Sequence, residues 1–186
     1  MSGAFPPKVV GAGEGKTVML FGVRFGYKVV SGDSGGRLAV LEVEIPAGTL
    51  VKPHSHARED EFSLVLSGTV GVRTGDRVSA AGPGAYLVKP RGVPHAMWNA
   101  GGTPATVAEI LSPAGLEEYF EKLAPILAAH RPAAEYYQLA EDYGQGRLVK
   151  VRWRVSSRRR GWRCRWWPCR WCGRLCRGRC TWTWRA

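Results

Sequence analysis

Two glycine-bounded motifs constrain this chain more than any other feature, because together they hold three of its four histidines. The first runs GTLVKPHSHAREDEFSLVLSG over residues 48–68, and the second runs GAYLVKPRGVPHAMWN over residues 84–99. His54 and His56 are two residues apart, so on a strand both side chains point to the same face. Each motif also carries several β-branched and aromatic residues, which are typical of strands.

The remaining polar residues of the motifs complete a set of metal-binding donors. Glu61 opens the next strand after a four-residue turn, and His95 follows a bend with two prolines that starts a third strand. Three imidazoles and one carboxylate suit a single divalent transition metal (Fe, Mn, Ni, Cu or Zn) and are too rich in nitrogen for Ca or Mg. A six-coordinate metal would keep two positions open for substrate or O2, which indicates a reactive site rather than a structural one. The alternative for His54 and His56 is a solvent-facing pair, and the second motif favours the metal site.

Turn signals recur at even spacing between Thr17 and Leu111. Each separates short runs rich in β-branched and aromatic residues, a pattern that predicts an antiparallel sandwich or barrel and an all-β fold class. The turns are 31–36, 46–48, 67–68, 74–76, 81–84 and 99–102.

Both motifs resemble the two signature motifs of the cupin superfamily, with Gly, His, His, Glu, Gly and then Gly, Pro, Gly, His, Asn in register. Residues from about 15 to 145 are similar in layout to the small single-domain cupins described as quercetin 2,3-dioxygenase-like. The resemblance implies an antiparallel jelly-roll β-barrel, a hairpin around residues 74–77 and a homodimer. It also implies a metal bound by His54, His56, Glu61 and His95.

The resemblance implies an oxidative function. We expect a dioxygenase-type oxidoreductase that acts on a small, quercetin-like aromatic substrate, with Glu61 as both a metal ligand and the base that takes a proton from the substrate. The same four ligands also serve metal-dependent isomerases, lyases and decarboxylases, as well as cupins that bind small ligands without turnover. These alternatives stay open, because function depends on the pocket lining and not on the fold.

Other residues receive weaker predictions. Asn99 matches the last motif position and is expected to hold a loop or a water by hydrogen bonds rather than bind metal, because an amide oxygen competes poorly with imidazole. His130 is expected to be exposed or to cap a helix. The candidates for the substrate wall, for each of which core packing is the alternative, are Phe25, Tyr27, Tyr86, Met97 and Trp98.

Alternation in the strand that begins at Glu61 divides its side chains between two faces. Glu61 and every second residue after it share one face, and Phe62, Leu64 and Leu66 share the other. If Glu61 points into the barrel, the large apolar side chains point outward. We expect the terminal segments or a second subunit to cover them.

The domain organisation follows from changes in composition and period. Ser112-Pro113 has the residues of a helix start, with an apolar stripe after it, and a second helix is expected from about Pro132 to Tyr143, with Gly144 as its stop. The expected segments are an irregular N-terminal stretch (1–16), the barrel (17–111), one or two C-terminal helices (112–146) and a basic tail (147–186).

The tail differs from the rest of the chain in amino-acid composition and in charge. Residues 151–186 hold 12 arginines, no acidic residue, all five cysteines and seven of the eight tryptophans, whereas residues 1–150 have balanced charge. We interpret the tail as an unstructured or out-of-frame segment. The alternatives are nucleic-acid binding through Arg and Trp and zinc binding through its cysteines. Because the body lacks cysteine, a signal peptide and a long apolar run, we expect a cytoplasmic protein without a membrane partner.

Overall fold

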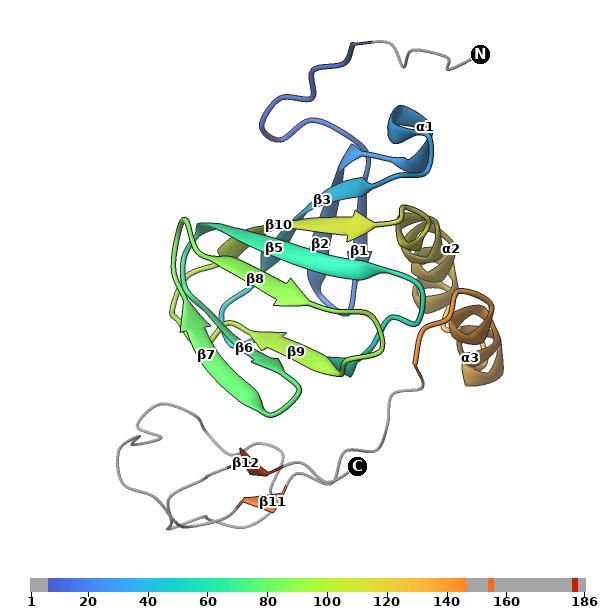
Figure 1. Cartoon of the computed structure of the whole chain (residues 1–186). Coiled ribbons are helices and arrows are strands. Elements are labelled where there is room, and N and C mark those ends of the chain that lie inside the picture. The colour runs from blue at the N-terminus through green and yellow to red at the C-terminus, as the bar shows by residue number, and fades with distance from the viewer. Residues whose placement is uncertain (1–6, 147–153, 156–181, 184–186) are drawn as a thin grey trace. The chain divides into compact units, whose positions relative to one another are not determined.

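The computed structural model describes residues 7–146, 154–155 and 182–183. The chain divides into two units, residues 1–149 and residues 150–186. The first unit consists of two antiparallel sheets and two C-terminal helices, α2 (Leu116–Ala128) and α3 (Ala133–Asp142) (Figure 1). The predicted all-β jelly roll followed by helices is confirmed.

The larger sheet has six strands in the order β1-β2-β3-β10-β5-β8. Much of its inner face is apolar, because alternate residues of β3 and β10 point toward the second sheet, among them Leu41, Ile45 and Val107, all buried. The strands are β1 (Thr17–Leu20), β2 (Val23–Val29), β3 (Ala39–Ile45), β10 (Ala105–Ser112), β5 (Asp60–Ser67) and β8 (Tyr86–Lys89).

The smaller sheet has four strands in the order β4-β9-β6-β7 and faces the first sheet. The hairpin between β6 and β7 turns at residues 75–76, as predicted. Gly71 must lack a side chain, since a Cβ there would lie 2.1 Å from the ring of Trp98 on the neighbouring strand. The strands are β4 (Leu50–His54), β9 (His95–Trp98), β6 (Val70–Thr74) and β7 (Arg77–Ala81).

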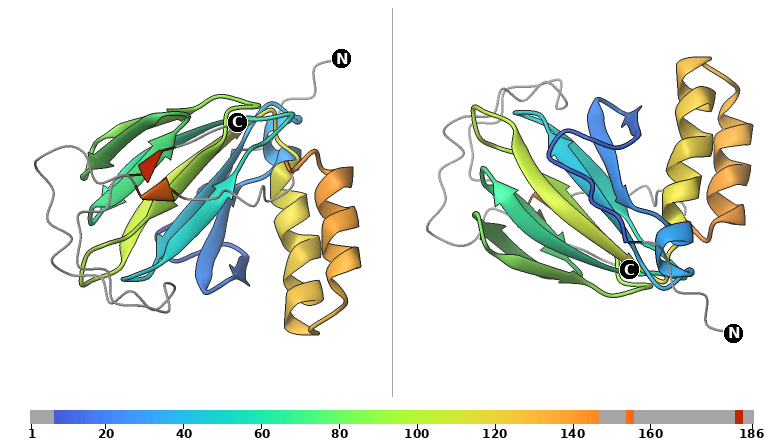
Figure 2. Two further views of the ribbon diagram at one scale, coloured as in Figure 1. Left: turned by 90° about the horizontal axis from the view of Figure 1, so that it is seen from below. Right: turned by 90° about the horizontal axis from the view of Figure 1, so that it is seen from above.

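The two C-terminal helices lie side by side next to the β1–β2 end of the larger sheet (Figure 2). The phenol of Tyr27 in β2 donates a hydrogen bond of 2.9 Å to the backbone carbonyl of Glu117 in α2. The Glu117 carboxylate is buried and accepts hydrogen bonds from the backbone N–H groups of Ser31 (2.8 Å) and Gly115 (2.7 Å). It therefore caps α2 and ties it to α1 (Ser31–Ser34).

The start of the first helix differs from its prediction. Ser112 is the last residue of β10 and pairs with Asp60, so the helix begins at Leu116 rather than at Pro113. The strand takes precedence because its ladder continues to Ser112 and the acidic cap comes later, at Glu117. The second helix matches its prediction.

The second unit is described at only four residues. There β11 (Arg154–Val155) pairs with β12 (Trp182–Thr183) in antiparallel orientation. The prediction that the basic tail forms no folded unit, and its nucleic-acid and zinc alternatives, otherwise concern residues outside the described ranges. The proposed segment boundaries stay predictions. No helix in the described ranges has the length and apolar character needed to span a bilayer.

Candidate metal centre

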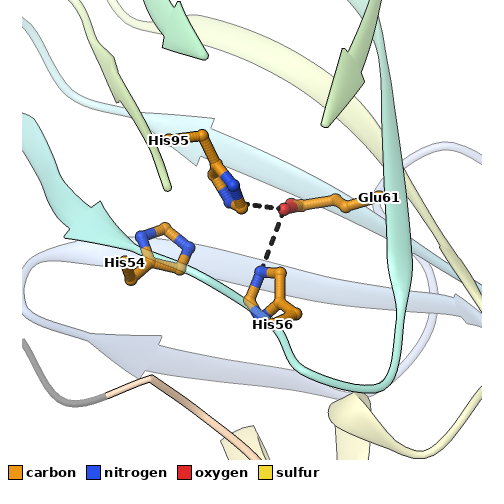
Figure 3. A group of neighbouring side chains, drawn as sticks. All are labelled: His54, His56, Glu61 and His95. Atoms are coloured by element: carbon orange, nitrogen blue, oxygen red, sulfur yellow. Dashed lines mark hydrogen bonds and ion pairs between the residues drawn. The ribbon is translucent and has the colours of Figure 1, made fainter. Parts of the chain in front are cut away.

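Three strand ends bring the four predicted ligands together between the two sheets. His54 is the last residue of β4, His95 is the first of β9, and the two are directly paired in the antiparallel ladder. Glu61 lies near the start of β5 in the opposite sheet and faces inward. His56 follows β4 by two residues, so that its imidazole joins the other two (Figure 3).

The four side chains converge on one point. One donor atom from each residue can be chosen so that all four lie within 4.8 Å of one another. The ring centroids of the histidines are 4.4 to 5.1 Å apart. Figure 3 shows the Glu61 carboxylate reaching toward the imidazoles from the other side of the site.

Hydrogen bonds fix the orientation of each imidazole. The Nδ1 atoms face acceptors: the carbonyl of Lys52 (2.7 Å) for His54, the amide oxygen of Gln145 (2.7 Å) for His56 and the carbonyl of Val93 (3.1 Å) for His95. Each Nδ1 therefore carries the proton and donates it, which leaves the Nε2 lone pairs to face the centre. This is the tautomer that a metal-binding histidine uses when its second nitrogen is hydrogen-bonded.

The distances between donor atoms fit a transition metal. Oε2 of Glu61 lies 3.0 Å from Nε2 of His56 and 2.9 Å from Nε2 of His95. Two ligands with bonds of about 2.1 Å, at right angles to each other, are separated by about 3.0 Å. The buried Nε2 of His95 has no hydrogen-bond partner in the described part of the chain, because its approach to Glu61 lacks hydrogen-bond geometry. The donor set therefore fits a divalent ion.

The charge states of the four residues also suit cation binding. Burial alone would raise the pKa of Glu61, but the Lys89 ammonium, the hydrogen bond from His56 and the close His95 imidazole hold it well below its usual value. Burial and the neighbouring imidazoles lower the pKa of His54 to about 3, although the residue as a whole is only half-buried. His54 is therefore neutral and Glu61 ionised at neutral pH, as metal ligands must be.

His56 behaves differently in the metal-free protein. Burial opposes its charged form, but the hydrogen bond and the negative charge of Glu61 outweigh burial and raise the pKa of His56. With Nδ1 donating to Gln145, a hydrogen bond from Nε2 to Glu61 requires a second proton on the ring. A metal ion at the centre would displace that proton and take its place between the two side chains.

Two backbone contacts hold the ligand-bearing loop in position. Gly92 donates a 2.7 Å hydrogen bond to the carbonyl of His56, and its φ of 72° is one that glycine adopts without strain. On the other side, the chain that leaves α3 pairs with the loop through a bridge between His56 and Gln145. The segment after α3 thus contacts the loop that carries His56 through Gln145.

A second polar cluster lies directly behind Glu61. The Lys89 ammonium is 2.9 Å from Oε1 of Glu61 and 2.8 Å from Oε2 of Glu109, and the Ser63 hydroxyl donates to the same Glu109 oxygen at 2.7 Å. All three residues of this cluster are buried. Burial and the nearby Glu61 raise the pKa of Glu109 to about 7 against the opposing charge of Lys89, while both carboxylates keep the pKa of Lys89 raised despite its burial.

The remaining predictions for individual residues have mixed outcomes. The structural role of Asn99 is confirmed, because its amide donates to the carbonyls of Ile45 (2.9 Å) and Thr103 (2.8 Å) and accepts from the Gly101 N–H (2.8 Å). His130 is exposed and outside the cluster, as expected.

The candidates for the substrate wall mostly lie elsewhere. Tyr86 is exposed on the outer face of β8, Phe25 packs on Phe120 of α2 with ring centroids 4.9 Å apart, and Tyr27 belongs to the core. Trp98 is partly exposed and lies against Gly71. Met97 alone shares a strand face with His95, two residues away.

The sequence predictions missed four polar residues around the site. A signal existed for Lys89 and Glu109, since each occupies an inward position of an alternating strand, where a charged side chain must meet a partner. Ser63 shares the inward face of β5 with Glu61 in the same way. No local signal pointed to Gln145, because its contact with His56 depends on the path of the chain after α3.

Comparison with known proteins shows that the part of the chain that carries the centre matches a known domain model. Residues 41–111, which carry all four converging side chains, match the family model described as "Cupin domain". A search of curated proteins by sequence found no match.

Solved structures show the same fold. A predicted oxalate decarboxylase from Thermotoga maritima is 17% identical, with a TM-score of 0.54 over 57% of this chain and 99% of that one. KdgF from Halomonas sp. is 18% identical, with a TM-score of 0.52 over 59% of this chain and 96% of that one. The polyketide cyclase RemF from Streptomyces resistomycificus is 24% identical, with a TM-score of 0.52 over 57% of this chain and 80% of that one. At these identities the similarity shows a cupin fold and says nothing about activity.

Proposed function

We propose that this protein is a mononuclear metal enzyme, a dioxygenase-type oxidoreductase that acts on a small aromatic substrate of the quercetin type. The observation that carries the proposal is the convergence of three Nε2 atoms and one carboxylate oxygen, each held by a hydrogen bond or ion pair on its far side. Four protein ligands leave two positions of a six-coordinate metal for small molecules. A bound Fe, Mn, Ni or Cu ion would supply the redox chemistry for reaction with O2.

The residues of this chain would have three tasks. His54, His56 and His95 hold the metal through Nε2, and their Nδ1 hydrogen bonds fix the rings in that orientation. Glu61 binds through Oε2. Because its carboxylate is ionised at neutral pH, Glu61 also carries the proposed role of proton acceptor for a substrate hydroxyl group.

A non-redox lyase or isomerase is the second candidate, because the same donors bind Zn, which polarises oxygen atoms of a substrate without electron transfer. Of the structural neighbours, one carries the name predicted oxalate decarboxylase and another polyketide cyclase. The proposal for this chain nevertheless remains oxidative, because four protein donors leave two positions of a six-coordinate redox metal open for substrate and O2.

The test separates redox from non-redox chemistry. The protein is purified from its host, its metal is identified by elemental analysis, and O2 consumption is measured with a panel of flavonols and catechols. The proposal predicts O2 uptake by the native metal form and none by the Zn-substituted form. Conversion of a panel substrate without O2 uptake, at equal rates in both forms, would instead establish the lyase or isomerase candidate.

We further propose a homodimer in the cytoplasm. The outward positions of β5 and β8 carry Phe62, Leu66, Tyr86 and Val88, and the last two are 74% and 60% exposed. Phe62 is paired with Val88 and Leu64 with Tyr86 across the ladder, so apolar side chains lie side by side on the outer face at an edge strand. A second copy of the chain would remove this surface from water.

A further inference from the structure

A buried lysine contacts the carboxylate of Glu61 on the side away from the histidines. Lys89 is only 2% exposed and lies directly opposite Glu61 in the antiparallel ladder of β5 and β8. Its Nζ atom is 2.9 Å from Oε1 of Glu61. A lysine is almost never fully buried unless it is paired. The burial of Lys89 directly beside the centre therefore indicates a specific role.

The two oxygens of Glu61 are engaged on opposite sides. Oε2 faces Nε2 of His56 at 3.0 Å and Nε2 of His95 at 2.9 Å, whereas Oε1 accepts the charge-assisted contact from Lys89. A carboxylate can bind a metal through one oxygen or through both. While Oε1 is held by an ammonium group, only Oε2 is available to a metal at the centre.

Lys89 is itself held in place by a second acid. Its Nζ atom is 2.8 Å from Oε2 of Glu109 on β10, and that oxygen also accepts a hydrogen bond from Ser63. The ladders pair Lys89 with Glu61 and Ser63 with Glu109, so the polar row crosses β8, β5 and β10 diagonally, with a step of two residues along β5. If Lys89 turned away, it would leave Glu109 buried without its charged partner, which is costly.

We propose that Lys89 is a positioning residue that keeps Glu61 a one-oxygen ligand, and that it thereby preserves an open metal position for the substrate. The inference rests on the proposed metal centre and adds how the protein sets the number of open positions. Without Lys89, Glu61 would bind through both oxygens and occupy a position that the substrate needs. Glu109 serves to neutralise and anchor Lys89.

The experiment uses cobalt(II) as the metal and azide as the probe of an open position. Cobalt(II) is loaded into the full-length wild type, Lys89→Arg, and the double variant Lys89→Met with Glu109→Gln, which removes one positive and one negative charge together. Lys28→Met, a change of a lysine on β2 outside the polar row, is the matched control. Cobalt affinity is measured by chelator competition, azide binding by visible absorption, and folding by thermal unfolding.

The proposal predicts that the double variant still binds cobalt but binds azide at least about tenfold more weakly, an effect within the range usual for residues that support a metal ligand. Lys89→Arg, which restores a cationic donor, should recover most of the azide affinity, and Lys28→Met should match the wild type. Azide affinity unchanged in the double variant would overturn the role of Lys89 while leaving the metal centre intact. A wild type that binds no divalent metal would instead overturn the proposed function itself.

A measurement on the wild type covers the case in which the Lys89 variants do not fold. Infrared difference spectra of the metal-loaded against the metal-free protein distinguish a carboxylate bound through one oxygen from one bound through two, by the separation of its two stretching bands. The proposal predicts the wide separation of one-oxygen binding for Glu61, identified as the band lost in Glu61→Gln. The narrow separation of two-oxygen binding would contradict the proposal.

Discussion

The position of a single proton on each imidazole decides whether these residues can bind a metal. In all three histidines Nδ1 donates to an oxygen of the protein, so Nε2 is the free nitrogen. Glu61 raises the pKa of His56, so without metal the His56 ring favours a second proton. Metal binding and proton release are therefore coupled at His56.

That coupling predicts a pH dependence of metal affinity. Burial would lower the pKa of His56, but Glu61 raises it above the ordinary value, so the protonated ring stabilises the metal-free fold. That stability is fully present below the unfolded pKa and is lost as the pH rises through the folded pKa. Metal must displace the same proton, so its affinity should increase as the pH rises from the ordinary pKa of histidine through the raised pKa of His56. Chelator competition measures this, and an affinity that stayed constant over that range would contradict the coupling.

Individual residues also show where sequence reasoning reached its limit. The convergence of the four side chains could be predicted, because their spacing and chemical type indicate a shared site once the strands that carry them face each other. Lys89 and Glu109 were missed, although their inward positions in β8 and β10 can be read from the alternation of each strand. What the sequence did not contain was the cross-strand register that brings the two together.

At the scale of elements, the strands were more predictable than the junctions between them. Alternation in β5 predicted its inward and outward faces, and the burial of Glu61, Ser63 and Val65 confirms that prediction. The predicted start of α2 was wrong. Ser112 and Pro113 have the residues of a helix start, but tertiary pairing extends the β10 ladder to Ser112. The contact of the segment after α3 with the metal-binding loop could not be predicted, since it depends on how the helices pack.

That contact links the segment after α3 to the candidate metal centre. Gln145→Ala removes the acceptor for Nδ1 of His56, so the ring loses its fixed orientation. We expect metal affinity to fall by about 10–100-fold, as is typical when the partner of a metal-binding histidine is lost. The matched control is Gln138→Ala in α3, whose side chain donates only to Asp142 among the contacts described and lies outside the centre. Equal metal affinity in the two variants would show that Gln145 has no part in binding.

At the scale of the whole molecule, the apolar outer face of β5 and β8 is the surface through which we expect two copies of the chain to associate. The C-terminal helices pack at the β1–β2 end and leave Tyr86 and Val88 exposed, and we propose that a second subunit covers these side chains. A lysine in place of Val88 would put a charge into the interface and should convert the dimer to a monomer. Light scattering at tens of micromolar is the measurement.

The control for assembly is Val78→Lys on β7, which changes a similarly exposed valine of the other sheet. That variant should keep the mass of the wild type. A wild type that is already monomeric would contradict the proposed homodimer. The same result in both lysine variants would place the interface elsewhere.

The most direct test of the central claim is the metal content of the purified protein. Elemental analysis should find about one divalent transition metal per chain in the wild type and in His130→Ala, which changes the one histidine outside the cluster. The double variant His54→Ala with His56→Ala removes two of the four donors and should lose the metal while thermal unfolding shows that it remains folded. Full metal occupancy in a folded double variant would contradict the assignment of the centre.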